Sequence, residues 1–382
     1  MTSLSLDVLC IGNAIVDVIA DADDAFLKAQ SLDKGSMRLI DEAEAERLYG
    51  EMGLGREASG GSAGNTAAGL AALGVRAGFV GQVADDQLGT IYRHDIRSLG
   101  VTFDTPARSD VGATARCLIL VTPDAQRTMN TFLGAAQQLS AAQIDLDQVR
   151  GAGILYLEGY LWDPEVPRAA MEAAIAAARE AGRKVAFTLS DTFCVERHRE
   201  GFHRLLDEQK VDILFANEAE LLKMTGADEF EAGLAQLSAK VPMLVVTRSE
   251  AGAVAVAGSA RAAVPAEPIA RLIDTTGADE FEAGLAQLSA KVPMLVVTRS
   301  AAGAVAVAAS ERAAVPAEPI ERLIDTTGAG DLFAAGFLAG QARGLGLEAS
   351  LKLGAIAAAE VIQHYGARPE ADLRVLAAGV LS

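Results

Sequence analysis

Short apolar runs alternate with helical runs along most of this 382-residue chain, and this order limits the fold more than any other feature. We expect strands at 6–20, 77–83, 154–160, 184–189 and 213–216, and helices at 41–52, 62–73 and 167–181. A strand, a helix and a further strand in succession predict βαβ crossovers and a mainly parallel sheet. Two loosely alternating runs, 113–122 and 127–133, are expected to pair as a hairpin. The chain is therefore predicted to be α/β.

Composition and charge restrict the classes of partner. Apolar residues make up 51% of the chain and aromatic residues only 5%, so small aliphatic side chains must fill the core, as in parallel sheets covered by helices. The formal net charge of −18 repels nucleic acid and anionic membranes. It would also repel ATP, so a nucleotide site would need local donors. A solvated surface that aids solubility is the simpler explanation of the acidity.

The cysteines and the first residues indicate a compartment. Cys10, Cys117 and Cys194 are odd in number and far apart, which fits neither a disulfide framework nor a CxxC metal site. The start of the chain lacks the basic and apolar segments of a signal peptide, and no apolar run is long enough to span a bilayer. We expect a cytoplasmic protein.

An internal repeat interrupts the pattern. Residues 226–276 match residues 277–327 except at four pairs of positions: Glu250/Ala301, Gly258/Ala309, Ala260/Glu311 and Ala270/Glu321. Each copy is expected to form a helix and three strands before the sequence LIDTT. Two copies fall short of a solenoid, so we interpret them as a recent or engineered tandem duplication within one domain. The extra copy is expected to form a folded appendage or to mediate self-association as a homodimer.

The segment 323–340 carries the clearest chemical signal. A strand ending in 325–327 leads into the turn Gly328-Ala329-Gly330, and an apolar helix begins at about Asp331. Small residues allow close approach of a ligand, and the amides at a helix start attract anions. A carboxylate there could accept a proton from an attacking hydroxyl. The alternative is that Asp331 is only an N-cap.

A second glycine-rich segment precedes the helix expected at 62–73. Gly60-Gly61 could hinge a lid or admit a substrate, and Asn65 falls in the first turn of the helix. An ordinary loop with Asn65 as a cap explains this segment equally well. The chain contains neither the P-loop pattern GxxxxGK[ST] nor a GxGxxG spacing after Gly12, which argues against a P-loop kinase and against a dinucleotide-binding oxidoreductase.

These segments bring the chain close to one family. Residues 323–340 resemble the carboxy-terminal signature of the ribokinase, or PfkB, family of carbohydrate and nucleoside kinases. Residues 59–73 resemble its amino-terminal signature, and 217–220 is similar to its Asn-x-x-Glu motif. The resemblance covers the chain apart from one copy of the repeat. Within the family, 11–17, 34–37 and 131–135 look most like the bacterial adenosine kinase branch.

The resemblance implies a fold and a reaction. The fold would be a ribokinase-like three-layer sandwich with a small β lid formed by about 19–39 and 111–133. The reaction would transfer the γ-phosphate of ATP to a hydroxyl of a nucleoside, adenosine first, or of a ribose- or fructose-like sugar. Asp331 would be the base, and positive potential at the phosphate would come from Arg127 and from the amides of Gly328, Ala329 and Gly330. Taken alone, Arg127 would be a plain surface residue.

The resemblance also implies ligand roles. Asp17 would bind two substrate hydroxyls, with Asn13, Gly61, Ser62 and Asn65 around it, although an internal ion pair is the alternative for an Asp in a buried strand. Asn217 and Glu220 would order water around Mg²⁺. The remaining implied residues are Thr298, Ser300 and Gly303 near the nucleotide, and Asp325 and Thr327 at a monovalent cation, potassium in many relatives.

The duplication departs from the family pattern. The first copy repeats the turn as far as Ala278, but Asp279 and Glu280 stand where the second copy has Gly330 and Asp331. An acidic Asp279 would repel a phosphate, so we expect 277–280 to be a decoy without catalytic role. The alternative function is a catalytically impaired, kinase-like protein that binds ligands or self-associates.

Overall fold

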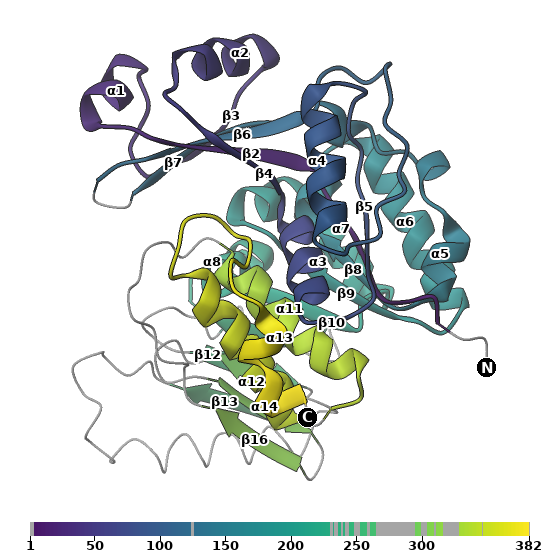
Figure 1. Cartoon of the computed structure of the whole chain (residues 1–382). Helices are drawn as coiled ribbons and strands as arrows, with labels where there is room; N and C mark the ends of the chain where they lie inside the picture. Colours follow the sequence, from purple (N-terminus) through teal and green to yellow (C-terminus); the bar gives the residue numbers. More distant parts are fainter. Residues whose placement is uncertain are drawn as a thin grey trace.

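The computed structural model describes residues 4–123, 126–229, 328–345 and 347–381, and between them residues 232, 236, 237 and 240 and six short strands. An eight-stranded sheet runs through the centre in the order β13-β12-β11-β10-β9-β8-β1-β5 (Figure 1). Its strands from β5 to β11 pair in parallel, whereas β12 and β13 pair antiparallel at one edge. The predicted α/β class with a mainly parallel sheet is confirmed.

The elements follow the expected order with shifted ends. The main-sheet strands are β1 (Leu6–Ile11), β5 (Ala77–Val80), β8 (Ala152–Glu158), β9 (Lys184–Thr188), β10 (Ile213–Asn217), β11 (Leu244–Thr247), β12 (Ala253–Ala257) and β13 (Ala260–Val264). The helices are α1 (Asp24–Ala29), α2 (Glu42–Glu51), α3 (Ser62–Ala72), α4 (Gln87–Ser98), α5 (Leu146–Gly151), α6 (Glu165–Glu180), α7 (Thr192–Asp207), α8 (Glu218–Thr225), α11 (Ala329–Ala342), α12 (Leu347–Val361), α13 (Leu373–Leu376) and α14 (Ala378–Leu381).

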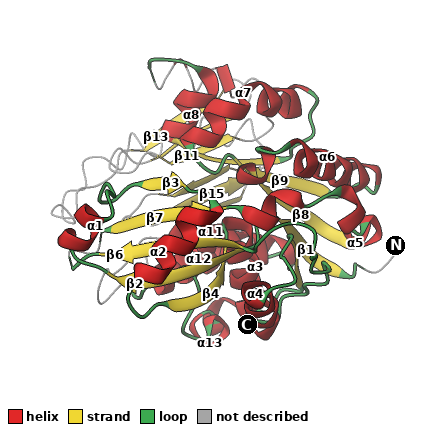
Figure 2. Cartoon of the chain, turned by 90° about the horizontal axis from the view of Figure 1, so that it is seen from above, coloured by secondary structure: helices red, strands yellow, loops and turns green. Residues whose placement is uncertain are grey.

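Side-chain alternation along the strands creates two apolar cores. Leu9 and Ile11 of β1 point to the face covered by α5, α6 and α7, whereas Val8 and Cys10 point to the face covered by α3, α4, α11 and α12. A strand buried on both faces is expected to be apolar, as β1 is from Val8 to Ile11. Helices thus lie on both sides of the sheet, as seen from above in Figure 2, and form the three layers.

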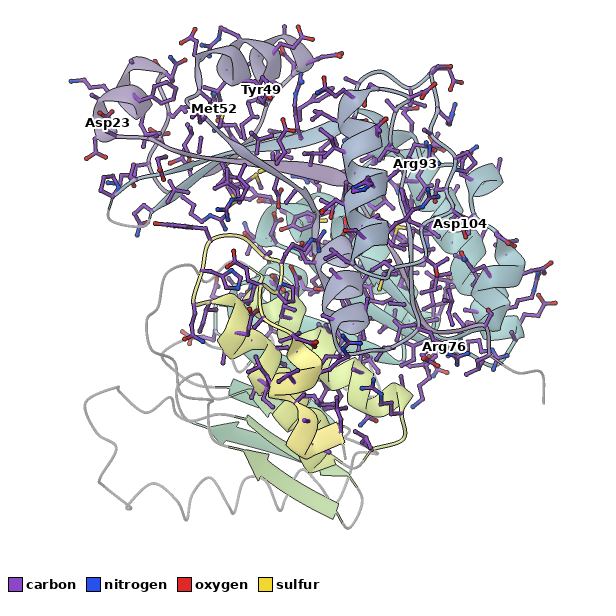
Figure 3. All side chains as sticks on the ribbon, viewed as in Figure 1. Asp23, Tyr49, Met52, Arg76, Arg93 and Asp104 are labelled. Atoms are coloured by element: carbon purple, nitrogen blue, oxygen red, sulfur yellow. The ribbon has the colours of Figure 1, made fainter. Side chains whose placement is uncertain are left out.

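A second sheet stands beside the first and has five strands in the order β3-β7-β6-β2-β4. They are β2 (Ile15–Asp21), β3 (Met37–Leu39), β4 (Arg56–Gly60), β6 (Ala115–Val121) and β7 (Arg127–Phe132). The pairing of β6 with β7 is antiparallel, which confirms the predicted hairpin. The short helix α1 and helix α2, which carries Tyr49, lie on the outer side of this small sheet (Figures 1 and 3).

One strand prediction was wrong, because residues 6–20 form two strands in different sheets. β1 ends at Ile11 and β2 begins at Ile15, so the chain passes from the main sheet to the small sheet between them. The carboxylate of Glu158, at the end of β8, fixes this passage. It accepts hydrogen bonds from the backbone N–H of Asn13 at 2.7 Å, from Asn13 Nδ2 at 2.9 Å and from the N–H of Ala63 at 2.7 Å.

The strands of the two repeat copies occupy different sheets. Those of the first copy, β11 to β13, extend the main sheet next to β10. Those of the second copy, β14 (Leu295–Thr298), β15 (Ala304–Ala308) and β16 (Glu311–Val315), form a separate three-stranded sheet that contacts α12, β11 and β12. The helices expected at the start of each copy fall largely outside the described residues. Within the described part of the chain, no helix is long and apolar enough to cross a membrane.

The helix that begins at the predicted phosphate turn packs closely on its neighbour. A Cβ atom at Gly336 of α11 would lie only 2.3 Å from the carbonyl oxygen of Leu353 and 2.5 Å from the N atom of Gly354, both in α12. Backbone atoms cannot move aside as a flexible side chain does. The absence of a side chain at Gly336 therefore sets the separation of α11 and α12.

We expect Gly336→Ala to lower the free energy of unfolding by about 1–3 kcal/mol, because an added methyl group overpacks this contact. Gly50→Ala is the matched control, since Gly50 lies in helix α2 and a Cβ atom there would meet no other atom within 4 Å. It should leave stability unchanged or raise it by up to about 1 kcal/mol. Urea unfolding measures both variants, and equal stability of the two would contradict the packing argument.

A second prediction concerns the carboxylate at the passage between the sheets. Glu158→Ala should lower the free energy of unfolding by about 2–4 kcal/mol, because three buried N–H donors lose their acceptor. Glu172→Ala, which removes a surface carboxylate paired with Arg204, should cost no more than about 1 kcal/mol. A loss in Glu158→Ala as small as in this control would show that the passage does not depend on Glu158.

Candidate active site

Most of the predicted site residues that the structure describes gather where the carboxyl ends of the parallel strands meet the small sheet. Asn13 follows β1, Glu158 ends β8 and Asn217 ends β10. Ligands of open α/β sheets bind at this edge, because the strands end there and the helices begin. Asp17 reaches the same region from β2 of the small sheet, and Asp331 reaches it from α11.

Asp331 is not the N-cap of its helix. α11 begins at Ala329 after Gly328, so Asp331 lies within the first turn. Its carboxylate points to α3, where Oδ1 accepts a hydrogen bond from Ser62 Oγ at 2.9 Å and Oδ2 accepts one from Asn65 Nδ2 at 3.1 Å. The structure thus joins two predicted segments that lie more than 260 residues apart in sequence. Asn65 is likewise no cap, because the N-cap of α3 is Gly61.

The turn before Asp331 leaves its amides open. Gly328 has the positive φ of 77° that favours glycine, and no side chain of the described residues caps the helix. The first backbone bond of the helix runs from the N–H of Leu332 to the carbonyl of Gly328, so the preceding N–H groups point out of the helix start. No atom of the described residues lies within 4 Å of a Cβ position at Gly330. This geometry can accept a phosphate oxygen.

Asp17 faces the site from the small sheet. It pairs in register with Ala58 of β4 and Cys117 of β6, and its carboxylate lies against the Cα of Gly60, where a Cβ atom would meet Oδ2 at 2.3 Å. Within the described part of the chain, the Asp17 carboxylate makes no hydrogen bond or ion pair. The described residues therefore do not form the internal ion pair that was the alternative for Asp17.

Burial and nearby charges set the protonation of these carboxyls. Burial raises the pKa of Asp331 to about 6, while the hydrogen bonds from Asn65 and Ser62 and the charge of Arg368 act in the opposite direction. Burial also raises the pKa of Asp17 to about 6, although the charges of Arg368 and Arg127 lower it. A carboxyl with a pKa near 6 is ionised at neutral pH and is a better proton acceptor than an ordinary Asp.

Asn13 and Gly61 pack against each other at the site. The buried Asn13 amide donates to Glu158, so its Oδ1 is the atom left for a ligand. Gly61 has a φ of 85°, and a Cβ atom there would lie 2.2 Å from the carbonyl oxygen of Asn13. Only glycine fits this close approach. Burial raises the pKa of Glu158 itself to about 7 despite the donors from Asn13 and Ala63.

The Asn-x-x-Glu motif forms a capping box at the start of α8. Asn217 donates to Glu220 from its backbone N–H at 2.9 Å and from Nδ2 at 2.7 Å, and the Glu220 N–H donates back to Asn217 Oδ1 at 3.0 Å. Burial raises the pKa of Glu220 to about 7. Each Glu220 oxygen keeps a lone pair that could accept from a metal-bound water.

These residues fit Mg²⁺ only through water. Among the described residues, no group of three or more His, Cys, Asp or Glu side chains could hold a metal ion directly. Mg²⁺ commonly keeps several waters and takes substrate phosphates as its other ligands. The buried and oriented Glu220 carboxylate suits such an outer-sphere role.

Several predicted residues cannot be placed. Ser300, Gly303, Asp325 and Thr327 lie outside the described residues, as does the decoy turn 277–280. Thr298 is described only as the last residue of β14. The expected roles of these residues remain predictions.

Two charged residues at the site were not predicted. Glu158 ends the apolar run of β8, and a charged residue at the end of a buried strand was the available signal. Arg368 follows α12 in a loop, and no pattern in the sequence distinguished it from a surface arginine. Its Nε donates to the carbonyl oxygen of Ser59 at 2.7 Å.

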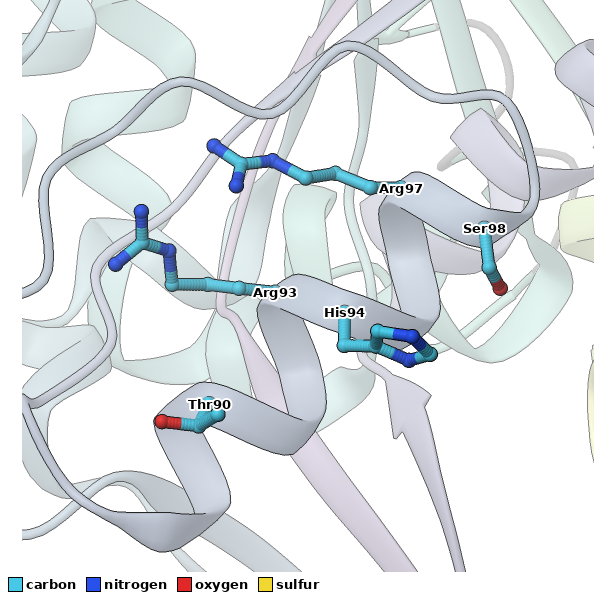
Figure 4. A pocket seen from close by; sticks show the side chains of 5 residues that line it. All are labelled: Thr90, Arg93, His94, Arg97 and Ser98. Atoms are coloured by element: carbon cyan, nitrogen blue, oxygen red, sulfur yellow. The ribbon is translucent and has the colours of Figure 1, made fainter.

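A surface hollow elsewhere on the molecule lacks this chemistry. It has a volume of about 480 Å³ and is lined by Thr90, Arg93, His94, Arg97 and Ser98, all on α4 (Figure 4). Arg97 is bound to the carbonyl oxygen of Phe103, with Nε at 2.8 Å. None of these described lining residues carries a carboxylate that could act as a base, so the hollow is not the candidate active site.

Comparison with known proteins agrees with the geometry. The family model described as pfkB family carbohydrate kinase matches residues 5–288 and 279–373. A probable sugar kinase from Rhizobium etli CFN 42 is 41% identical and has a TM-score of 0.78, with 99% of each chain covered. The adenosine kinase from Sinorhizobium meliloti is 42% identical with a TM-score of 0.77, covering 98% of this chain and 99% of its own.

A curated relative agrees with these structures. A fructokinase from Klebsiella pneumoniae is 27% identical over 256 residues, which is 66% of this chain and 83% of the relative. Together these matches do not favour the alternative of an impaired binding protein. The chain is a phosphotransferase that uses ATP and acts on a hydroxyl of a nucleoside or sugar, and it belongs to the pfkB family of carbohydrate kinases.

Proposed function

We propose that the acceptor is a nucleoside, with adenosine preferred and a ribose- or fructose-like sugar as the second choice. The similar adenosine kinase from Sinorhizobium meliloti supports the first choice, and the similar probable sugar kinase supports the second. Asp17 supports either, because a carboxylate without a protein partner among the described residues can accept hydrogen bonds from two neighbouring hydroxyls.

Asp331 is the proposed base. It takes the proton of the acceptor hydroxyl while the hydroxyl oxygen attacks the γ-phosphorus and the bond to ADP breaks. Such a base typically contributes about 10²–10⁴-fold in rate. The single observation that carries this role is that the Asp331 carboxylate, held by Ser62 and Asn65, lies in the first turn of a helix with open amides.

Positive potential for the transferring phosphate has three proposed sources, of which two lie in the chain and the third is bound Mg²⁺. The amides of Gly328, Ala329 and Gly330 offer donors at the helix start, where the helix dipole adds partial positive charge. Arg127 adds a full charge from β7, close enough to lower the pKa of Asp17. Bound Mg²⁺ would neutralise charge on the phosphates, and Glu220 with Asn217 would orient its waters. These local groups offset the net charge of −18.

The remaining roles follow from the family resemblance. Asn13, Gly61, Ser62 and Asn65 would surround the acceptor with Asp17. The small sheet would close over the acceptor as a lid and exclude water, which otherwise competes as acceptor. The other proposed ligands are Thr298, Ser300 and Gly303 for the nucleotide, and Asp325 and Thr327 for potassium.

An ADP-release assay with Mg²⁺ and potassium tests the acceptor. Adenosine, inosine, ribose and fructose are compared in parallel, and we expect the highest kcat/KM with adenosine. Omitting potassium in a matched series tests the cation. Highest activity with ribose or fructose would replace the nucleoside proposal by a sugar, and absence of turnover with all four would overturn both.

Asp331→Asn should lower kcat by about 10²-fold or more, because the amide cannot accept the proton. ATP binding, measured by calorimetry, should persist, since the amides of the turn are unchanged. Asp104→Asn is the control, because its exposed carboxylate lies in a loop and, within the described part of the chain, pairs only with Arg97 at 3.7 Å. A wild-type rate in Asp331→Asn would contradict the assigned role.

A further inference from the structure

Arg368 lies in the loop after α12 and is fixed to the small sheet. Its Nε donates to the carbonyl oxygen of Ser59 at 2.7 Å, and Nη2 donates to Ser59 Oγ at 3.2 Å. Asp95 of α4 holds Ser59 in turn, accepting from the Ser59 N–H at 2.8 Å and from Ser59 Oγ at 2.5 Å. The guanidinium therefore has a defined position rather than that of a flexible surface side chain.

The surroundings of Arg368 are the segments that carry the site. The neighbouring Ala367 packs on Gly328, where a Cβ atom would lie 2.5 Å from the Ala367 Cβ atom. Nη2 lies 3.5 Å from a Cβ position at Gly64, which stands between the two residues that hold Asp331. Ser59 precedes Gly60, against which the Asp17 carboxylate packs. Arg368 thus contacts both the Asp331 side and the Asp17 side of the site.

Two neighbouring carboxylates at the site repel each other, and a nearby positive charge would offset this repulsion. Asp17 and Asp331 are both acidic, and the charge of Asp331 raises the pKa of Asp17. The charge of Arg368 lowers the pKa of both carboxyls. Its Nη1 is buried and has no hydrogen-bond partner among the described residues, so part of the guanidinium is not used by the protein framework. An arginine stays protonated at neutral pH even when buried.

We propose that Arg368 is a positioning residue for phosphoryl transfer. It keeps Asp17 and Asp331 ionised side by side, so that Asp17 binds the acceptor hydroxyls while Asp331 accepts the proton. This inference rests on the proposed function and adds to it a residue from outside the family signatures. Among the described residues, the other charged or titratable groups that interact with Asp17 or Asp331 are Arg127, Tyr92, Cys117, Glu158, Tyr156 and Tyr160.

The test compares pH profiles of kcat/KM for the best acceptor of the wild type. For the wild type we expect activity to fall as the pH drops through about 6, because protonated Asp331 cannot accept a proton. In Arg368→Gln the positive charge is lost, so this acidic limb should move up by about one pH unit or more. kcat/KM should then fall about twofold or more at pH 7, and by up to about tenfold on the acidic limb itself. Arg368→Lys keeps the positive charge, so its kcat/KM should fall over the same acidic pH range as that of the wild type.

Controls separate this role from a structural one. Arg374→Gln removes an exposed arginine whose only ion pair among the described residues is with Asp372, and it should leave the profile unchanged. A folded Arg368→Gln variant with the acidic limb of the wild type would overturn the inference.

If Arg368→Gln does not fold, Ser59→Ala is the second test, because loss of the Ser59 hydroxyl removes one of the two hydrogen-bond acceptors that hold the guanidinium. A shifted acidic limb in this variant supports the inference, and an unshifted limb overturns it. No turnover by the wild type with any acceptor would instead overturn the proposed function, and the inference with it.

Discussion

The buried carboxylate of Glu158 is the interaction on which the rest of the site depends. It accepts three N–H donors from two segments, the passage from β1 to β2 and the start of α3. That passage carries the chain from the main sheet to the small sheet and so brings Asp17 to the site. The start of α3 carries Ser62 and Asn65, which hold Asp331. One buried carboxylate, Glu158, thereby fixes the two segments of the chain that form the proposed nucleoside or sugar site.

The charge distribution follows from the same arrangement. Asp17, Asp331, Glu158 and Glu220 are all acidic, and burial raises the pKa of each. In an acidic chain such a cluster would repel ATP unless donors were placed among the carboxylates. The open amides at the start of α11 and the charges of Arg127 and Arg368 supply that balance. We therefore propose that the site is both a proton acceptor and an anion binder.

The sequence predicted the parts of the structure that local patterns control. The α/β class, the β6–β7 hairpin, the helix predicted at 62–73 and the helix after Gly328 follow from apolar periodicity and from glycine at a turn. The split of residues 6–20 into β1 and β2 was missed, because continuous apolar character does not reveal which sheet each half joins. Arg368 was missed because its partners, Ser59 and Gly64, are about 300 residues away in sequence. The two repeat copies have nearly the same sequence, yet their strands lie in different sheets, which no local pattern could distinguish.

The central claim is that one site formed by Asp17 and Asp331 binds the acceptor and removes its proton. A crystal structure of the chain with adenosine, Mg²⁺ and a non-hydrolysable ATP analogue tests it most directly. We expect two hydroxyls of the nucleoside on the Asp17 carboxylate, and the accepting hydroxyl within hydrogen-bond distance of Asp331 and in line with the γ-phosphate. An acceptor bound away from Asp17, or a γ-phosphate remote from the turn 328–330, would contradict the account.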